Sequence, residues 1–289
     1  GTYITTPFVS SEEATINIRT TVKNENKTAK EVKLISKIVD NKGNLLDTET
    51  SSQTIGPFSK IEISQEGKIQ KPMLWSPETP TLYKILTEVA DNGNIVDTYV
   101  TNFGVRTIEF NRNGFFLNGK LYPVKGTANH EDFAGVGVAL PDKVNDYKIK
   151  LLKQIGCNGY RCAHNPPSPE LLDICDSLGM LVLDENRHLS SSGENLKDLT
   201  TMLYRDRNHP SIFVWSMENE EWLEGTVTGK RILETMVETT HQIDPTRPVT
   251  AAMNHGRNES GYSDVLDVVW YNYGDKGMAY VRDHEQYPD

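Results

Sequence analysis

The chain has 289 residues, of which 37% are hydrophobic and 24% charged, and its formal net charge is −10 at pH 7. The length is enough for two domains, and the composition is typical of a soluble globular protein. The negative charge argues against nucleic acid or a membrane surface as a partner, and no apolar run is long enough to span a membrane. The chain opens with neither a signal peptide nor a methionine, so we expect it to begin inside a longer protein.

Residues 1–104 have the hydrophobic pattern of β-strands. Apolar residues alternate with polar ones at 16–22, 32–38 and 83–89, and turn-forming sequences lie at 40–44 and 91–94. A period of two indicates strands with one buried and one solvated face, joined by hairpins. Roughly seven short strands in about a hundred residues predict an immunoglobulin-like β-sandwich.

From residue 105 onward, short apolar strands alternate with helical patterns. The predicted strands lie near 121–126, 157–162, 180–184, 211–216, 247–251 and 266–271, and a last helix lies near 276–286. This alternation indicates parallel strands with crossover helices, in a barrel or in a doubly wound sheet. Candidate site residues follow several different strands, which favours a (β/α)8 TIM barrel. Because a closed barrel needs eight strands, residues 105–289 predict a barrel truncated after about six, unless another chain completes it.

The three cysteines are Cys157, Cys162 and Cys175, all within apolar segments. Their odd number and their surroundings predict buried thiols rather than a disulfide framework or a metal site. This pattern leaves the compartment open between the periplasm and the cytoplasm of a bacterium. The oligomeric state is open too, a homo-oligomer included.

The stretch from Ile212 to Glu220 carries the strongest functional signal. An apolar strand runs into the pair Asn219-Glu220 with no turn residue between them. In an α/β barrel the chemistry lies at the carboxyl ends of the strands, so we expect an amide and a carboxyl group side by side there. Taken alone, such a glutamate more often caps a helix or joins a salt bridge, and such an asparagine more often caps backbone groups.

Five motifs occur in a fixed order along the chain. They are Leu74–Tyr83, Phe103–Arg106, Lys125–Glu131, Asn158–Pro167 and Arg205–Glu220. In order and spacing they resemble glycoside hydrolase family 2, the family of β-galactosidases, β-glucuronidases and β-mannosidases. The resemblance covers nearly the whole chain. It implies a carbohydrate substrate and an immunoglobulin-like sandwich followed by a TIM barrel.

The resemblance assigns catalytic work to the Asn219-Glu220 pair. Glu220 resembles the family's general acid/base, which protonates the leaving oxygen and then deprotonates a water molecule. Asn219 resembles the asparagine that hydrogen-bonds the sugar 2-hydroxyl. The family usually has glycine just before this asparagine, whereas this chain has Glu218. That extra carboxyl group is expected either to perturb Glu220 or to point away from it.

Four more residues have substrate-binding or supporting roles by the same resemblance. Arg161 resembles the residue that holds the nucleophilic carboxylate through a bidentate contact, with a structural ion pair as the alternative. His130 and His164 resemble residues that contact the sugar. Tyr273 resembles the tyrosine that hydrogen-bonds the nucleophile, with Tyr271 as its rival.

Asp184 and Glu185 end the third predicted strand. Adjacent residues on a strand point to opposite faces, so at most one of them faces the site, where we expect it to support other side chains. The large galactosidases of the family carry a magnesium site just beyond this strand, with a glutamate and a histidine. Residues 186–190 do not reproduce it, so we predict no metal there and no cofactor.

The second catalytic carboxyl group is missing from the predicted strands. In the family a glutamate on the seventh strand attacks the anomeric carbon, and retention of configuration follows. After Tyr273 the chain offers only Asp275, Asp283, Glu285 and Asp289. Since Glu285 lies in the predicted last helix, we expect the nucleophile beyond residue 289 and a nearly inactive chain. The implied function is a retaining exo-β-glycosidase, foremost a β-galactosidase; a β-glucuronidase, a β-mannosidase and a non-catalytic carbohydrate-binding module are the alternatives.

Overall fold

The computed structural model describes residues 1–274 and 279–287. Its contacts divide the chain into two units, one made of Gly1–Thr107 with Asn208–Pro210 and the other of Ile108–Arg207 with Ser211–Asp289. Asp275 and Asp289, two of the carboxyl groups considered above, lie outside the described residues.

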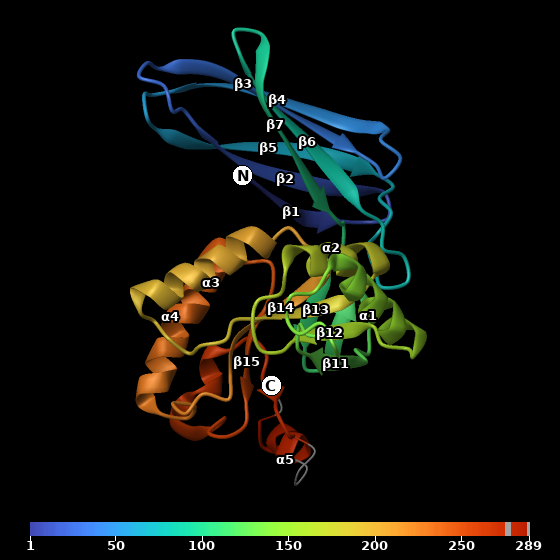
Figure 1. Ribbon diagram of the computed structural model, residues 1–289, viewed down its shortest axis with the longest axis vertical. Coiled ribbons are helices and arrows are strands. Elements are labelled where there is room, and N and C mark those ends of the chain that lie inside the picture. The colour runs from blue at the N-terminus through green and yellow to red at the C-terminus, as the bar shows by residue number, and fades with distance from the viewer. Residues whose placement is uncertain (275–278, 288–289) are drawn as a thin grey trace. The chain divides into compact units, whose positions relative to one another are not determined.

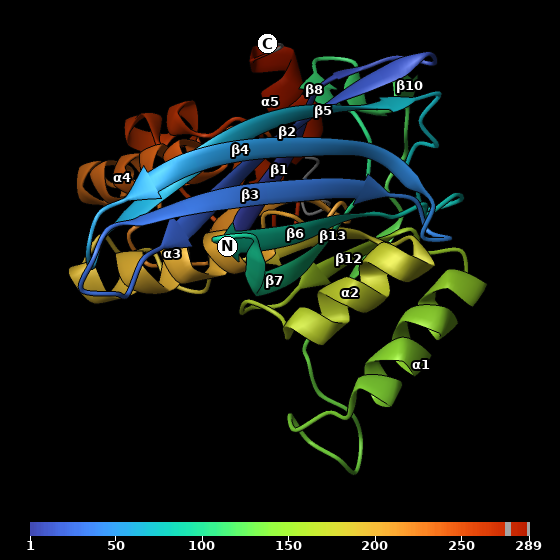
Figure 2. The same cartoon turned by 90° about the horizontal axis from the view of Figure 1, so that it is seen from above.

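The first unit is a sandwich of two antiparallel sheets (Figure 1). Its strands are β1 Thr2–Val9, β2 Glu13–Lys23, β3 Lys30–Val39, β4 Leu45–Ile55, β5 Lys60–Gln70, β6 Tyr83–Asp91 and β7 Asn94–Phe103. One sheet has the order β1-β2-β5 and the other β4-β3-β6-β7, and Figure 2 shows the strands of the second sheet running alongside one another. Alternate residues such as Ile16, Ile18, Leu34 and Ile38 are fully buried between the sheets. The predicted immunoglobulin-like sandwich is confirmed.

The hairpin between β3 and β4 follows from its turn chemistry. Asp40 accepts hydrogen bonds from the backbone N–H groups of Lys42 and Asn44, both at 2.8 Å. Gly43 has a φ of 84°, which glycine adopts without steric cost. The short turn fixes the register in which β3 and β4 pair.

Within the described residues, the second unit contains six parallel strands whose order in the sheet equals their order in the chain. They are β11 Gly126–Asn129, β12 Gly159–Cys162, β13 Leu181–Glu185, β14 Ile212–Asn219, β15 Val249–Met253 and β16 Trp270–Tyr271. The helices are α1 Asp142–Gln154, α2 Pro169–Leu178, α3 Gly193–Asp206, α4 Val227–Ile243 and α5 Ala279–Gln286, with 3-10 turns η1 Glu259–Gly261 and η2 Ser263–Val265. A doubly wound sheet reverses its strand order at a switch point, so this order is that of part of a barrel.

Two predicted strands differ from the observed ones. The strand expected at 121–126 begins only at Gly126, because Pro123 cannot donate to a strand ladder. The residues before it belong to a small antiparallel sheet of β8 Ile108–Asn111, β9 Gly114–Leu117 and β10 Lys120–Leu121. The strand expected at 266–271 shortens to Trp270–Tyr271, since η2 occupies Ser263–Val265 just before it.

The cysteines are free thiols, with Cys162 and Cys175 buried and Cys157 half-buried. Burial raises the pKa of both the Cys162 and the Cys175 thiol. Across the described residues, no helix has the length and apolar character needed to cross a membrane.

Candidate active site

The carboxyl ends of the parallel strands bring the candidate residues together. His130 follows β11, Glu185 ends β13, Asn219 ends β14, and Asn272 follows β16. Parallel strands have their carboxyl ends on one edge of the sheet, so side chains more than a hundred residues apart in the chain become neighbours there.

Arg161 on β12 is the centre of the hydrogen-bond network. Its Nε and Nη2 donate to the two carboxylate oxygens of Glu185 at 2.8 and 3.1 Å. Nη2 also donates to Oδ1 of Asn219 at 2.6 Å, and Nη1 donates to Oδ1 of Asn272 at 3.0 Å. The guanidinium therefore connects β12 to β13, to β14 and to the residue that follows β16.

Glu185 is fully buried and faces the site. Adjacent residues on a strand point to opposite faces, so only one of Asp184 and Glu185 can do so. Besides Arg161, it accepts hydrogen bonds from His164 Nδ1 at 2.7 Å and from Ser216 Oγ at 3.2 Å. Asp184 is also fully buried, and burial and then the charge of Asp206 raise its pKa. The expected supporting carboxylate is thus Glu185.

A β-bulge in β14 explains how Ser216 and Asn219 both reach the site. Ser216 pairs with Thr250 and Asn219 with Ala252, so β14 has one more residue than β15 over this span. Without that extra residue, side chains three positions apart would lie on opposite faces. The bulge places Asn219 beside Arg161 and leaves Glu218 on the other face, away from this network.

Glu220 is half-buried and lies next to Asn219 in the network. Its Oε1 accepts a hydrogen bond from Asn272 Nδ2 at 2.8 Å, and its backbone N–H donates to Ala252 O at 3.2 Å. Its φ of 55° is unusual for a residue with a side chain and indicates a conformation imposed by its surroundings. The pKa of Tyr273 is raised by a hydrogen bond to Glu220 and by the charge of that carboxylate.

Asn272 is the site residue that the sequence reading overlooked. Its Nδ2 donates to Glu220 and also to Asn219 Oδ1 at 3.0 Å. Arg161 can only donate, so the contacts of Arg161 with both asparagines fix which side of each amide carries the oxygen. The available signal was the position of Asn272 directly after the last apolar strand, where polar residues of the site were expected.

The two histidines and the two tyrosines proposed for the site differ in how they contact its carboxylates. The ring of His130 packs edge-on against that of His164, with centroids 5.3 Å apart, and His164 donates to Glu185. Tyr273 is 57% exposed beside Glu220, whereas Tyr271 has the guanidinium of Arg257 over its ring at 4.8 Å. Of the two tyrosines, Tyr273 is the one near the candidate acid/base.

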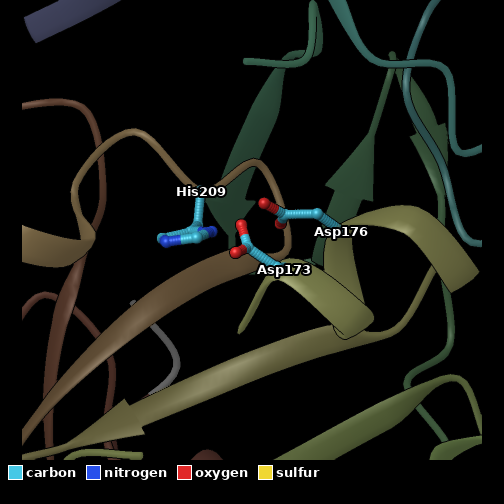
Figure 3. Close-up of side chains that lie close together, drawn as sticks. All are labelled: Asp173, Asp176 and His209. Carbon is cyan, nitrogen blue, oxygen red and sulfur yellow. The ribbon is translucent and has the colours of Figure 1, made fainter. Parts of the chain in front are cut away.

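Figure 3 shows Asp173, Asp176 and His209, three side chains of types that can bind a metal ion. Asp173 and Asp176 belong to α2 of the second unit, whereas His209 belongs to the first unit. Asp176 accepts a hydrogen bond from the backbone N–H of Ser211 at 3.0 Å, which secures the start of β14. No metal assignment follows from this group.

Two family models match the chain. "Glycosyl hydrolases family 2" matches residues 1–106, and "Glycosyl hydrolases family 2, TIM barrel domain" matches 108–197 and 190–284. The chain is 34% identical to the β-galactosidase BoGH2A of Bacteroides ovatus over 97% of its length, and 32% identical to a β-glucuronidase of Formosa agariphila over 81%. It covers 38% and 25% of those two proteins.

Solved structures that superpose on this chain include a member of this family and a β-glucuronidase. A glycosyl hydrolase family 2 member from Bacteroides cellulosilyticus superposes with a TM-score of 0.95 and 32% identity, covering 100% of this chain and 39% of that one. A Bacteroides uniformis β-glucuronidase superposes with a TM-score of 0.91 and 29% identity, covering 100% of this chain and 38% of that one. The chain therefore spans about two fifths or less of the length of these relatives.

Proposed function

Because this chain belongs to glycosyl hydrolase family 2, we propose that it is part of a retaining exo-β-glycosidase with Glu220 as the general acid/base. The observation that carries the proposal is the position of Glu220 at the carboxyl end of β14, hydrogen-bonded to Asn272 and beside Asn219. In the first step Glu220 donates its proton to the leaving glycosidic oxygen. In the second step it takes a proton from the water that releases the sugar.

Asn219 is proposed to bind the sugar 2-hydroxyl. Its Oδ1 already accepts from Arg161 and Asn272, which turns the amide NH2 group away from them. An amide held in this way can donate to a substrate oxygen without losing side-chain freedom on binding. Such a bond strengthens as the oxocarbenium-like transition state forms.

Arg161 is proposed to position this constellation rather than to grip the nucleophile through two bonds. Arginine has five N–H donors in a fixed plane. Glu185, Asn219 and Asn272 engage all three of its nitrogens, and among the described residues it is Glu185 that receives the bidentate contact. A nucleophilic carboxylate can then receive at most one further N–H, from Nη1.

A β-galactoside is the proposed substrate, since the β-galactosidase BoGH2A matches 97% of this chain. A β-glucuronide is the second candidate, because β-glucuronidases are among the relatives in sequence and in structure. Assaying the full-length protein with p-nitrophenyl β-galactoside, β-glucuronide and β-mannoside tests the proposal. Turnover of none of the three, with sugar binding unaffected by Glu220→Gln, would instead support a non-catalytic carbohydrate-binding module.

The 289-residue chain assayed alone is expected to give no robust turnover of these substrates. Double displacement needs a second carboxyl group about 5–5.5 Å from the acid/base. Of the described carboxylates, only Glu185 joins the network of Glu220, where Arg161 holds it as an ion pair and His164 hydrogen-bonds it. Robust release of p-nitrophenol by the purified chain would contradict this expectation, and the full-length protein serves as the positive control.

A further inference from the structure

Two buried carboxyl groups lie behind the candidate acid/base, on the face of β14 opposite Arg161. Glu218 is fully buried, and Glu224, in the loop after β14, is 2% exposed. Both accept a hydrogen bond from the same backbone donor, the N–H of Glu221, at 3.1 and 3.0 Å. That donor belongs to the residue directly after Glu220.

The pair requires a shared proton. Glu218 Oε1 is buried without a donor among the described residues, and both carboxyl groups converge on the single N–H of Glu221, so two unprotonated groups would place two buried negative charges side by side. The other titratable groups facing the pair are Glu221, Tyr262 and His255, whose Nδ1 lies 3.1 Å from Glu224 Oε2. Burial and then the charge of Glu224 raise the pKa of Glu218 to about 9, which favours a protonated pair at neutral pH.

Glu224 also connects the loop after β14 to the loop after β15. Its Oε2 accepts from the backbone N–H groups of Asn254 and His255 at 3.1 and 3.2 Å. Gly225 and Gly256 come so close that a Cβ on either would lie 2.6 or 2.7 Å from the backbone of the other. The backbone around Glu220 is therefore fixed on both sides, by Glu221 N–H and by the bond from Glu220 N–H to Ala252.

We propose that Glu218 and Glu224 form a proton-sharing pair that positions Glu220 for proton transfer by holding the backbone of Glu221. Neither side chain touches the substrate in this arrangement, so both are positioning residues. The inference rests on the proposed function. The left-handed backbone of Glu220 is strained for a residue with a side chain and persists only where neighbouring contacts determine it.

The test compares substrates that differ in their need for an acid. A dinitrophenyl β-glycoside has a leaving group that departs without protonation, whereas an alkyl β-glycoside depends on Glu220. In the full-length protein, Glu218→Ala is expected to lower kcat/KM about 10–100-fold on the alkyl glycoside and under about 3-fold on the dinitrophenyl glycoside. Glu218→Gln keeps a donor for Glu224 and an acceptor for Glu221 N–H, so its kcat/KM should stay within about 3-fold of wild type on both.

Two outcomes overturn the inference: equal losses on both substrates, as general destabilisation would give, or no loss for Glu218→Ala. Should that variant fold poorly, Glu218→Asp shortens the side chain by one methylene and predicts the same selective loss. Glu220→Gln is measured in parallel. If Glu220→Gln also lowers kcat/KM equally on both substrates, the proposed function itself is contradicted. If Glu220→Gln lowers it selectively and the Glu218 variants do not, only the positioning role of Glu218 and Glu224 is contradicted.

The stability of the chain should depend on pH through Glu218. Its pKa of about 9 in the folded chain exceeds the ordinary value of 4.5, so the folded state binds the extra proton between these pH values. Stability falls with rising pH wherever the folded state binds more protons, so Tm should decrease from pH 5 to pH 9. Glu218→Gln cannot titrate and should flatten this decrease, while the exposed Glu238→Gln on α4 should not. Parallel Tm curves for wild type and Glu218→Gln would contradict the shared proton.

Discussion

Glu220→Gln in the full-length protein is expected to lower turnover of an alkyl β-galactoside by about 10²–10⁴-fold, the usual contribution of a general acid/base. Glutamine keeps the acceptor that Asn272 uses at 2.8 Å, so the fold and sugar binding should change little. What it removes is the proton for the leaving oxygen and the base for the incoming water. The measurement is steady-state kinetics, with kcat falling far more than KM changes.

Azide distinguishes loss of the acid/base from loss of the whole site. With an activated aryl glycoside, the Glu220→Gln enzyme should still form the glycosyl intermediate but release it slowly, because no base activates water. Azide attacks without a base, so turnover should partly recover and a β-glycosyl azide should form. Glu238→Gln, an exposed carboxyl group on α4, is the matched control and should behave as wild type. Unchanged turnover in Glu220→Gln would exclude it as the acid/base.

The fold could be predicted from periodicity because each unit repeats one pattern. Period-two alternation in residues 1–104 and strand–helix alternation afterwards determine which faces are buried, and the structure has both. The errors fall where a local backbone feature interrupts the pattern. Pro123 delays the first strand of the parallel sheet, and η2 shortens the last. These are local backbone effects that a hydrophobic pattern does not contain.

The candidate site was only partly predictable, because its contacts depend on register. Strand order alone places His130, Arg161 and Glu220 at one edge of the sheet. The bulge between Ser216 and Asn219 decides that Asn219 faces Arg161 and that Glu218 faces away, and no residue in Ser216–Asn219 signals a bulge. Asn272 was overlooked for a similar reason, since the role of its amide depends on its position beside Asn219, which the pairing of the strands determines.

Removing the carboxylate of Glu185 should have the largest effect on stability. Glu185→Gln is expected to lower the free energy of unfolding by about 3–5 kcal/mol, because it leaves the buried guanidinium of Arg161 without a charge partner. The Arg161 side chain is 10% exposed and that of Glu185 is 0% exposed, so water cannot replace the lost contact. Urea unfolding of the chain, followed by circular dichroism, measures the change.

The matched control is Asp146→Asn in the same unit, where Asp146 pairs with Lys150 at 2.6 Å on the surface of α1. Because both partners are solvated, this change should have no measurable effect. Glu185→Gln should also reduce turnover in the full-length protein, since Arg161 fixes the amide of Asn219 only while Glu185 holds it. A stable Glu185→Gln variant with wild-type turnover would mean that Arg161 keeps its place through Asn219 and Asn272 alone. The bidentate pair would then contribute nothing to positioning the sugar-binding amide.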